Sequence, residues 1–373
     1  MRLGGMVNTC SLSSVSIGKW VERYREFSCC IRSRSILTYM NLFELTRALV
    51  DIDSVTPNEE AVGNYLVSYL RELAGRTNGC VEVQEVEPHR FNVYAVWGEP
   101  VVTFSTHMDT VPPFYGSHED EEFVYGRGAC DTKGIIASMI KAVEGLLAAG
   151  DRGFALLFVV GEERNSAGAY FAAKHPRGCR YIINGEPTEN KLALGSKGAL
   201  RYEVIASGKM AHSAYPELGE SAILKLLDAL ARIRKIELPT DAVLGASTLN
   251  VGTIHGGRAP NVIPDHAMAE LFIRLVDDGD LTRAAIAEAV RGLAEAKEIL
   301  CIPALHLGSL DGFETTVVSY TTDIPAFGTA WGQPFLFGPG SIHFAHTDAE
   351  KVPKAELLEA VEIYQNIVRR LSK

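Results

Sequence analysis

The chain has no long hydrophobic run: no apolar stretch approaches the roughly 18 residues that a helix needs to cross a bilayer. It also has no excess of basic residues, since 36 Lys and Arg stand against 46 Asp and Glu and the formal net charge is −10. An acidic chain is poorly matched to the phosphates of a nucleic acid or to an anionic membrane surface. We therefore expect neither a membrane nor a nucleic acid among the partners of this protein.

The cysteines show no pattern. The sequence holds seven of them, an odd number without regular spacing, and it contains no CxxC pair. This usage is typical of a reduced compartment rather than of a disulfide framework, so we expect a cytoplasmic protein. It also argues against a zinc site made of thiolates.

The first 39 residues differ in composition from the rest of the chain. They hold six Lys and Arg against two acidic residues, and three of the seven cysteines. Ile17, Trp20, Val21 and Tyr24 have helical spacing, so an amphipathic, arginine-rich helix similar to a transit peptide is one interpretation. The alternative, which we favour, is that Met40 is the true start and that residues 1–39 are a disordered or misassigned extension.

From residue 40 the chain has the periodicity of an ordinary globular protein, long enough for two domains. Its most continuous apolar run, Phe154–Val160, is typical of a central strand that is buried on both faces. Strands and helices alternate over residues 40–197, which predicts a doubly wound, mostly parallel α/β sheet. The expected helices are 42–49, 61–70, 135–147 and 168–174, and the expected strands are 81–86, 92–97, 101–105, 154–160 and 181–183.

Chemically active side chains follow three of these predicted strands. They are His107 and Asp109 after the strand at 101–105, Glu162 and Glu163 after the strand at 154–160, and Glu186 after the strand at 181–183. Because neighbouring strand ends lie about 4.8 Å apart along one sheet edge, we expect these groups to converge. Imidazole together with carboxylates matches an N/O metal site, with zinc as the first candidate. The alternative is that each group is a solvated loop charge or, for His107, a core histidine.

Asp131 lies just before the predicted helix at 135–147. A carboxylate in this position can act as an N-cap. It also falls between two of the strand-end groups in the sequence, so it is a further candidate for the metal site.

From about residue 198 the pattern becomes strand, helix, strand, strand, helix, strand, the order of a ferredoxin-like sandwich. The expected strands are 200–207, 247–254, 267–276 and 299–307, and the expected helices are 220–236 and 281–296. The chain then returns to an apolar stretch that ends at His346 and to a last helix over 354–371. We therefore expect one domain built from residues 40–197 and 309–373, with residues 198–308 inserted as a second.

Seven motifs follow one another along the chain: STHMDTVP, GRGACDTKG, GEE, NGEPT, GKMAHSAYPELG, GGRAPNVIPD and GPGSIHFAHTDAE. In this order they resemble the co-catalytic zinc amidohydrolase and exopeptidase family, which includes acetylornithine deacetylase, succinyl-diaminopimelate desuccinylase and glutamate carboxypeptidase. The resemblance covers residues 41–373. It implies a zinc catalytic domain and, in residues 198–308, a lid or dimerisation domain.

The resemblance also implies a set of metal ligands. His107 and Glu186 would bind one zinc ion, Glu163 and His346 the other, and Asp131 would bridge the pair. Cobalt or manganese could replace zinc, because borderline N/O sites accept several divalent metals. His343 lies three residues before His346 and is a competing candidate that we expect to line the pocket or to bond a neighbour.

Further roles follow from the same resemblance. Glu162 would be the general base, and Asp109 would orient His107. His212 would reach the active site of a partner subunit, which implies a homodimer. The expected substrate contacts are Asn261, Arg274 and Gly340.

The function implied is hydrolysis of an amide bond beside a free carboxylate in a small molecule. The segment GPGSI, Ala345-His346 and NGEPT look closest to acetylornithine deacetylase, so the first interpretation is a deacetylase of N-acetylornithine or N-acetylcitrulline, and hence a role in arginine biosynthesis. The alternatives are a metallo-exopeptidase that cleaves dipeptides or C-terminal residues, a hydrolase of carrier-protein-linked amino acids, and a non-catalytic binding homologue. The sequence alone does not separate the first two, because their catalytic residues are the same.

Overall fold

The computed structural model describes residues 40–373, and our predictions for the extension at 1–39 lie outside this part of the chain. Within the described residues, no helix is both long and apolar enough to cross a membrane. The cysteines described there are Cys80, Cys130, Cys179 and Cys301, and each is a free thiol.

A six-stranded sheet with the order β1-β2-β6-β3-β7-β19 forms the framework of the first part of the fold. Its strands are β1 Cys80–Glu87, β2 Arg90–Trp97, β3 Val102–His107, β6 Phe154–Val159, β7 Tyr181–Asn184 and β19 Gln333–Leu336. β3 pairs in parallel with both β6 and β7, and β19 extends the parallel set beyond β7. β1 and β2 run antiparallel at the other edge. The predicted doubly wound, mostly parallel sheet is confirmed.

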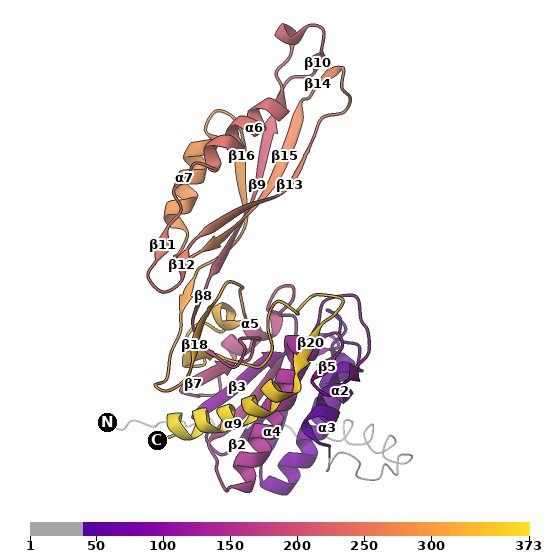
Figure 1. Cartoon of the computed structure of the whole chain (residues 1–373), viewed down its shortest axis with the longest axis vertical. Helices are drawn as coiled ribbons and strands as arrows, with labels where there is room; N and C mark the ends of the chain where they lie inside the picture. The colour runs from indigo at the N-terminus through magenta and orange to yellow at the C-terminus, as the bar shows by residue number, and fades with distance from the viewer. Residues whose placement is uncertain (1–39) are drawn as a thin grey trace, which may run out of the picture. The chain divides into compact units, whose positions relative to one another are not determined.

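Helices cover both faces of this sheet, which explains why β6 is buried along its whole length (Figure 1). Leu157 of β6 packs with α5 (Ala167–Lys174) and with α8 (Ile324–Phe327) on one face. On the other face, Phe104 of β3 meets Tyr364 of α9 edge-on at 5.1 Å between ring centroids. The helices on that side are α2 Leu42–Val50, α3 Glu60–Thr77, α4 Gly134–Ala148 and α9 Lys354–Leu371.

The order of the strands decides where the predicted site residues meet. β3 lies between β6 and β7, so the chain visits the middle strand first and its two neighbours later. His107 is the last residue of β3, Glu162 and Glu163 follow β6, and Glu186 follows β7. All three strands run in the same direction, so these residues leave the sheet at one edge.

A second sheet has the order β13-β15-β9-β16, and α6 and α7 cover one of its faces (Figure 1). Its elements are β9 Gly198–Ser207, α6 Ala222–Ile233, β13 Thr248–Gly256, β15 His266–Leu275, α7 Asp280–Val290 and β16 Glu295–Ile302. Alternate residues of β15 are buried, as expected of a strand with one covered face. This is the predicted ferredoxin-like βαββαβ order.

The boundaries of the last helix and strand of this unit differ from those predicted. The expected helix over 281–296 is too long, because α7 ends at Val290 and Gly292 follows with φ +75, a left-handed backbone that does not continue a helix. The expected strand at 299–307 in fact begins at Glu295 and is interrupted after Ile302 by Pro303. Charged residues at 295–298 had the periodicity of a helix but pair with β9 instead.

Short strands complete the described chain. β8 Leu192–Ser196 pairs with β17 Leu305–His306 and β18 Thr315–Val318, and β5 Phe123–Tyr125 pairs with β4 His118–Glu119 and β20 Lys351–Pro353. β10 Ala211–His212 pairs with β14 Val262–Ile263, and β11 Thr240–Asp241 with β12 Gly245–Ala246. Because β20 pairs with β5, the segment after His346 is held next to the loop that precedes Asp131.

Candidate metal centre

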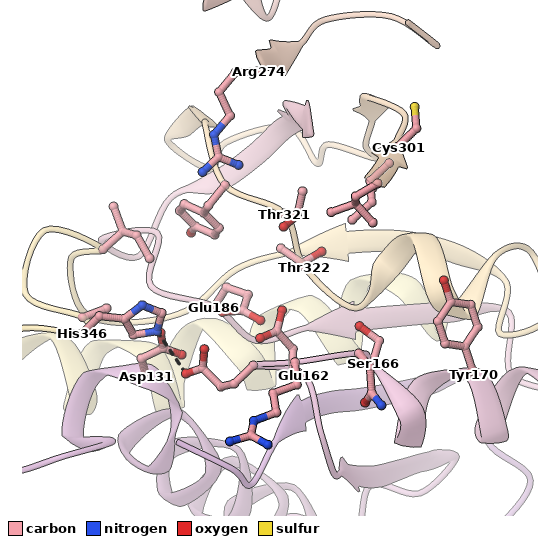
Figure 2. A pocket seen from close by; sticks show the side chains of 18 residues that line it. Asp131, Glu162, Ser166, Tyr170, Glu186, Arg274, Cys301, Thr321, Thr322 and His346 are labelled. Carbon is pink, nitrogen blue, oxygen red and sulfur yellow. Dashed lines mark hydrogen bonds and ion pairs between the residues drawn. The ribbon is translucent and has the colours of Figure 1, made fainter. Parts of the chain in front are cut away.

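A cavity of about 540 Å³ opens where the carboxyl ends of β6 and β7 meet the segments around Arg274, Thr321 and His346. Figure 2 shows His346 and Asp131 at one end of this cavity, Glu186 and Glu162 in its middle, and Ser166 and Tyr170 at the far end. Arg274 lies on the opposite wall, with its guanidinium directed towards the end that holds His346. The acids that follow β6 and β7 therefore share one cavity.

Asp131 lies between two imidazoles. Its Oδ1 is 2.9 Å from Nε2 of His107, and its Oδ2 is 3.3 Å from Nε2 of His346. Asp131 does not act as an N-cap, because α4 begins at Gly134 and no side chain caps it. One carboxylate that presents a separate oxygen to each of two histidines has the arrangement of a bridging ligand.

Glu163 completes the cluster around Asp131. Its Oε1 lies 3.0 Å from Nε2 of His346, and ligand atoms of His107, Asp131 and Glu163 all fall within 4.8 Å of one another. Two ligand atoms bound to one tetrahedral zinc at about 2.0–2.1 Å stand about 3.3 Å apart. The separations of His107 from Asp131 and of His346 from Asp131 and Glu163 are therefore each suited to two ligands of one cation.

Glu186 supplies a further donor. It is buried, and its Oε1 has no hydrogen-bond partner within the described residues. A buried carboxylate oxygen without a partner is costly unless a cation satisfies it. The donor set and this unsatisfied oxygen fit a site for divalent metal.

The charges in this cluster perturb one another strongly. Hydrogen bonds from His346 to Asp131 and Glu163 raise the pKa of its imidazole to about 10. Burial opposes a positive charge on His107, yet hydrogen bonds to Asp109 and Asp131 raise the pKa of its imidazole well above the usual value. Burial raises the pKa of Glu186 and of Glu163. The positive charge of His107 opposes this shift and favours the ionised form of both acids. A bound cation would have the same effect.

Asp109 has more contacts than the sequence predicted. The Nδ1–H of His107 donates to the backbone carbonyl of Asp109 at 3.0 Å, while the nearest carboxylate oxygen is 3.5 Å away. Because a carbonyl can only accept, this bond fixes the tautomer and leaves Nε2 of His107 facing the site. The carboxylate of Asp109 is buried and accepts backbone N–H groups from Gly161, Glu162 and Glu163 at 3.0, 3.1 and 3.2 Å.

Thr56 is a site residue that no sequence pattern indicated. Its hydroxyl donates to Oδ2 of Asp109 at 2.7 Å, across 53 positions of the chain. Only the folding of the loop after α2 brings it there.

Glu162 lines the same cavity, next to Glu163. Its backbone is held by Asp109, and burial raises the pKa of its carboxyl well above the usual range. A carboxyl with a raised pKa is suited to taking up and returning a proton near neutral pH.

Several predicted residues do not reach this cavity. His212 and Asn261 are exposed and lie together on the β10–β14 pair, where the N–H of Ser213 donates to the carbonyl of Asn261 at 3.0 Å. Neither residue lines the cavity of its own chain. His343 is also exposed and outside the lining, so the first of our two expectations for it, that it lines the pocket, is not met.

Gly340 likewise lies outside the lining, and packing explains its small size. Its N–H donates to Oε2 of Glu356 at 2.7 Å, its φ is +91, and a Cβ there would lie 2.5 Å from Sγ of Cys130. Gly340 allows two chain segments to approach closely.

Other residues near the cavity were missed. Asp323 is 1% exposed, neither of its carboxylate oxygens has a hydrogen-bond partner among the described residues, and burial raises its pKa to about 7. Tyr320 lines the cavity, and its hydroxyl donates to the carbonyl of Pro187 at 2.8 Å. Glu350, four residues after His346, contacts the turn that carries Asp131. An acid inside the AHTDAE motif was the one available signal for Glu350.

Comparison with known proteins places this chain in a family of metallopeptidases. The sequence model described as peptidase family M20/M25/M40 matches residues 103–370. A peptidase M20 domain-containing protein of Schizosaccharomyces pombe is 40% identical over 343 residues, which cover 88% of this chain and 84% of the relative. A "Probable carboxypeptidase" of Aspergillus niger is 34% identical, with 96% of each chain covered.

Solved structures have the same fold. The aminopeptidase PepT of Bacillus cereus superposes with a TM-score of 0.74 at 21% identity, covering 89% of this chain and 98% of that one. The YXEP protein of Bacillus subtilis, described as a dinuclear metal binding peptidase from the M20 family, gives a TM-score of 0.65 at 16% identity over 89% and 98%. At this level of identity the solved structures show the fold alone.

Proposed function

Because the chain belongs to peptidase family M20/M25/M40, we propose that it is a metallo-exopeptidase that releases the C-terminal amino acid of a dipeptide or short peptide. It is a metal-dependent hydrolase of this family. Relatives of 34% to 36% identity carry the name carboxypeptidase, which favours the exopeptidase over the N-acetyl-amino-acid deacetylase that motif resemblance placed first.

We propose the following ligands for two divalent cations, with zinc as the first candidate and cobalt or manganese as substitutes. His107 and Glu186 belong to one ion, Glu163 and His346 to the other, and Asp131 to both. The separate approach of the two Asp131 oxygens to His107 and His346 supports this division. When bound, the cations would supply a Lewis acid for the amide carbonyl and would lower the pKa of a water molecule.

Glu162 is the proposed proton carrier. It takes a proton from the water that attacks the amide carbon and delivers it to the amine nitrogen as the carbon–nitrogen bond breaks. The raised pKa of its buried carboxyl supports both halves of this task. Asp109 holds the backbone of Glu162 in place while the proton moves.

The observation that carries hydrolysis of an amide beside a free carboxylate is the position of Arg274, and the names of the relatives then favour a peptide over an N-acetyl amino acid as substrate. The guanidinium of Arg274 lies on the cavity wall, makes no ion pair within the described residues, and stacks 4.7 Å from the ring centroid of Phe272. A half-buried arginine without a carboxylate partner is suited to receive a substrate carboxylate. The C-terminal carboxylate of a peptide has the required charge, and it lies next to the last amide bond.

The domain roles remain proposals that follow from the fold. We propose residues 40–197 and 309–373 as the catalytic domain and 198–308 as the lid or dimerisation domain. The exposed pair His212 and Asn261 would then act in the cavity of a partner subunit, which is consistent with their distance from the cavity lining of their own chain.

A substrate panel tests the proposal. The zinc-, cobalt- or manganese-loaded enzyme is offered Ala-Leu, N-benzyloxycarbonyl-Ala-Leu and Ala-Leu-amide, together with N-acetylornithine, N-acetylcitrulline and an N-succinyl amino acid. We expect leucine to be released from Ala-Leu and from N-benzyloxycarbonyl-Ala-Leu. Ala-Leu-amide, which lacks the free carboxylate, should be cleaved at a rate at least about tenfold lower. Faster cleavage of N-acetylornithine than of every peptide would favour the deacetylase and contradict the exopeptidase.

Arg274→Lys and Glu162→Gln are the matched controls. Arg274→Lys should raise KM for Ala-Leu more than it lowers kcat, because it loses bidentate contact with the carboxylate and keeps the charge. Glu162→Gln should lower hydrolysis of every member of the panel by about 10²- to 10⁴-fold, so activity that the substitution leaves undiminished comes from a contaminating peptidase.

A further inference from the structure

Glu350 is a buried carboxylate that does not itself line the cavity. Its side chain is 1% exposed, and it lies four residues after His346, immediately before β20. One oxygen, Oε1, accepts the backbone N–H groups of Gly128, Cys130 and Asp131 at 3.0, 3.2 and 3.1 Å. The other, Oε2, accepts from Nη1 of Arg127 at 2.6 Å.

These four hydrogen bonds connect two chain segments that are about 220 positions apart. One segment is the turn at 127–131, which ends in Asp131, and the other is the loop at 346–350, which begins with His346. Tyr115 closes the connection from the side, because its hydroxyl donates to the carbonyl of Thr347 at 2.8 Å and accepts the N–H of Glu350 at 3.2 Å. Each segment carries one member of the Asp131–His346 pair, whose side chains lie 3.3 Å apart.

The carboxylate of Glu350 is buried beside a second acid, Asp131. Burial raises the pKa of Glu350, and the nearby negative charge of Asp131 raises it further. A buried carboxylate in these surroundings is costly unless its hydrogen bonds offset the desolvation. The three backbone donors and Arg127 provide that compensation. The same hydrogen bonds fix the backbone of Asp131, which presents one oxygen to His107 and the other to His346.

We infer that Glu350 is a positioning residue for the metal centre: it sets the turn that carries Asp131 against the loop that carries His346, and so controls metal affinity. This inference rests on the proposed function, because the metal ligands are part of that proposal. Glu350 touches neither substrate nor metal and acts through Asp131 and His346.

The test compares Glu350→Gln with Glu356→Gln. The glutamine at 350 keeps its size, but its amide nitrogen must face either Arg127 or the backbone donors. Glu356 is the matched control, since it is a half-buried acid of the same C-terminal region that accepts one backbone N–H, from Gly340, at 2.7 Å. Its carboxylate bonds neither the turn at 127–131 nor the loop at 346–350.

Metal-free protein is titrated with Zn²⁺ in competition with a chromophoric chelator, and the rise in Tm on saturation is recorded. We expect Glu350→Gln to bind zinc about 10- to 100-fold more weakly, as for other residues that orient metal ligands. Its activity should recover in part as the zinc concentration is raised. Glu356→Gln should stay within about threefold of the wild type, a small difference for a change remote from the ligands.

Two results would overturn the inference. One is unchanged zinc affinity and unchanged metal-induced rise in Tm in Glu350→Gln. The other is a loss of Tm in the metal-free Glu350→Gln protein with normal affinity, which would make the residue structural only. If Glu350→Gln does not fold, Arg127→Lys tests the same contact from the other side and should show a smaller loss of affinity. A wild-type chain that binds no zinc would instead refute the metal centre, so the two failures can be told apart.

Discussion

The carboxylate of Asp109 accepts the backbone N–H of Glu162 at 3.1 Å, although 53 positions separate the two residues. The same carboxylate accepts the N–H groups of Gly161 and Glu163, and the carbonyl of Asp109 accepts from Nδ1 of His107. A single residue, Asp109, therefore orients both a proposed metal ligand and the turn that carries the proposed base. Asp109 does more than orient His107, since it also holds the backbone of residues 161–163.

Asp109→Asn should reduce kcat/KM by about 10- to 100-fold, because an amide nitrogen would face backbone donors that now meet an oxygen. Kinetic assays on metal-loaded protein measure this loss. Thr56→Ser is the control, since it keeps the hydroxyl that donates to Asp109. A variant with wild-type kinetics would show that the turn at 161–163 holds its shape without the carboxylate.

Glu162→Gln and Glu163→Gln should have different effects although the residues are adjacent. Glu162→Gln should keep its metal content and lose turnover by about 10²- to 10⁴-fold, the usual contribution of a general base. Glu163→Gln should lower the metal content, because Glu163 shares its oxygen with the cluster around Asp131. Elemental analysis together with kcat separates the two, and equal metal loss in both variants would contradict the assignment of Glu162.

Metal binding to the metal-free protein should release protons near neutral pH. Hydrogen bonds to Asp131 and Glu163 raise the pKa of His346 to about 10, so this imidazole is protonated at pH 7 without metal. A histidine must lose that proton to become a ligand. A pH indicator in weakly buffered solution measures the release, which His346→Ala should diminish. Equal release from the variant would remove His346 from the ligand set.

Asp323 should make stability depend on pH. Burial raises its pKa from 3.8 to about 7, so its contribution to stability is full below pH 4, falls as the pH rises to about 7, and then stays constant. Asp323→Asn should therefore raise Tm more at pH 8 than at pH 4.5. Differential scanning calorimetry compares the two, with the exposed Asp228→Asn as control. If Asp323→Asn changed Tm by the same amount at pH 4.5 and pH 8, ionisation of Asp323 would not be the cause of the pH dependence.

A subunit-mixing experiment tests the proposed dimer. If His212 completes the site of a partner, inactive His212→Ala and Glu162→Gln proteins should regain activity after mixing. Random exchange would restore about a quarter of the wild-type rate, because half of the dimers are mixed and each has one complete site. No recovery, with exchange confirmed by labelled subunits, would place His212 outside the chemistry.

The sequence was sufficient to predict the α/β class, the ferredoxin-like order at 198–308 and the convergence of His107, Glu162 and Glu186. These features follow from local periodicity and from the rule that parallel strands end at one edge of a sheet. It was less reliable where charged residues have helical spacing but form a strand, as at 295–298. It also placed Asn261 and Gly340 at the substrate, whereas neither lines the cavity of its own chain.

Only the tertiary structure decided how the groups meet. It placed β3 between β6 and β7, set Asp131 between His107 and His346, and turned Asp109 and Glu350 towards backbone amides of distant segments. These contacts join residues that are 24 to 222 positions apart, and no periodicity records them. Local patterns determine which strands and helices form, while the hydrogen bonds across such distances exist only after the chain has packed.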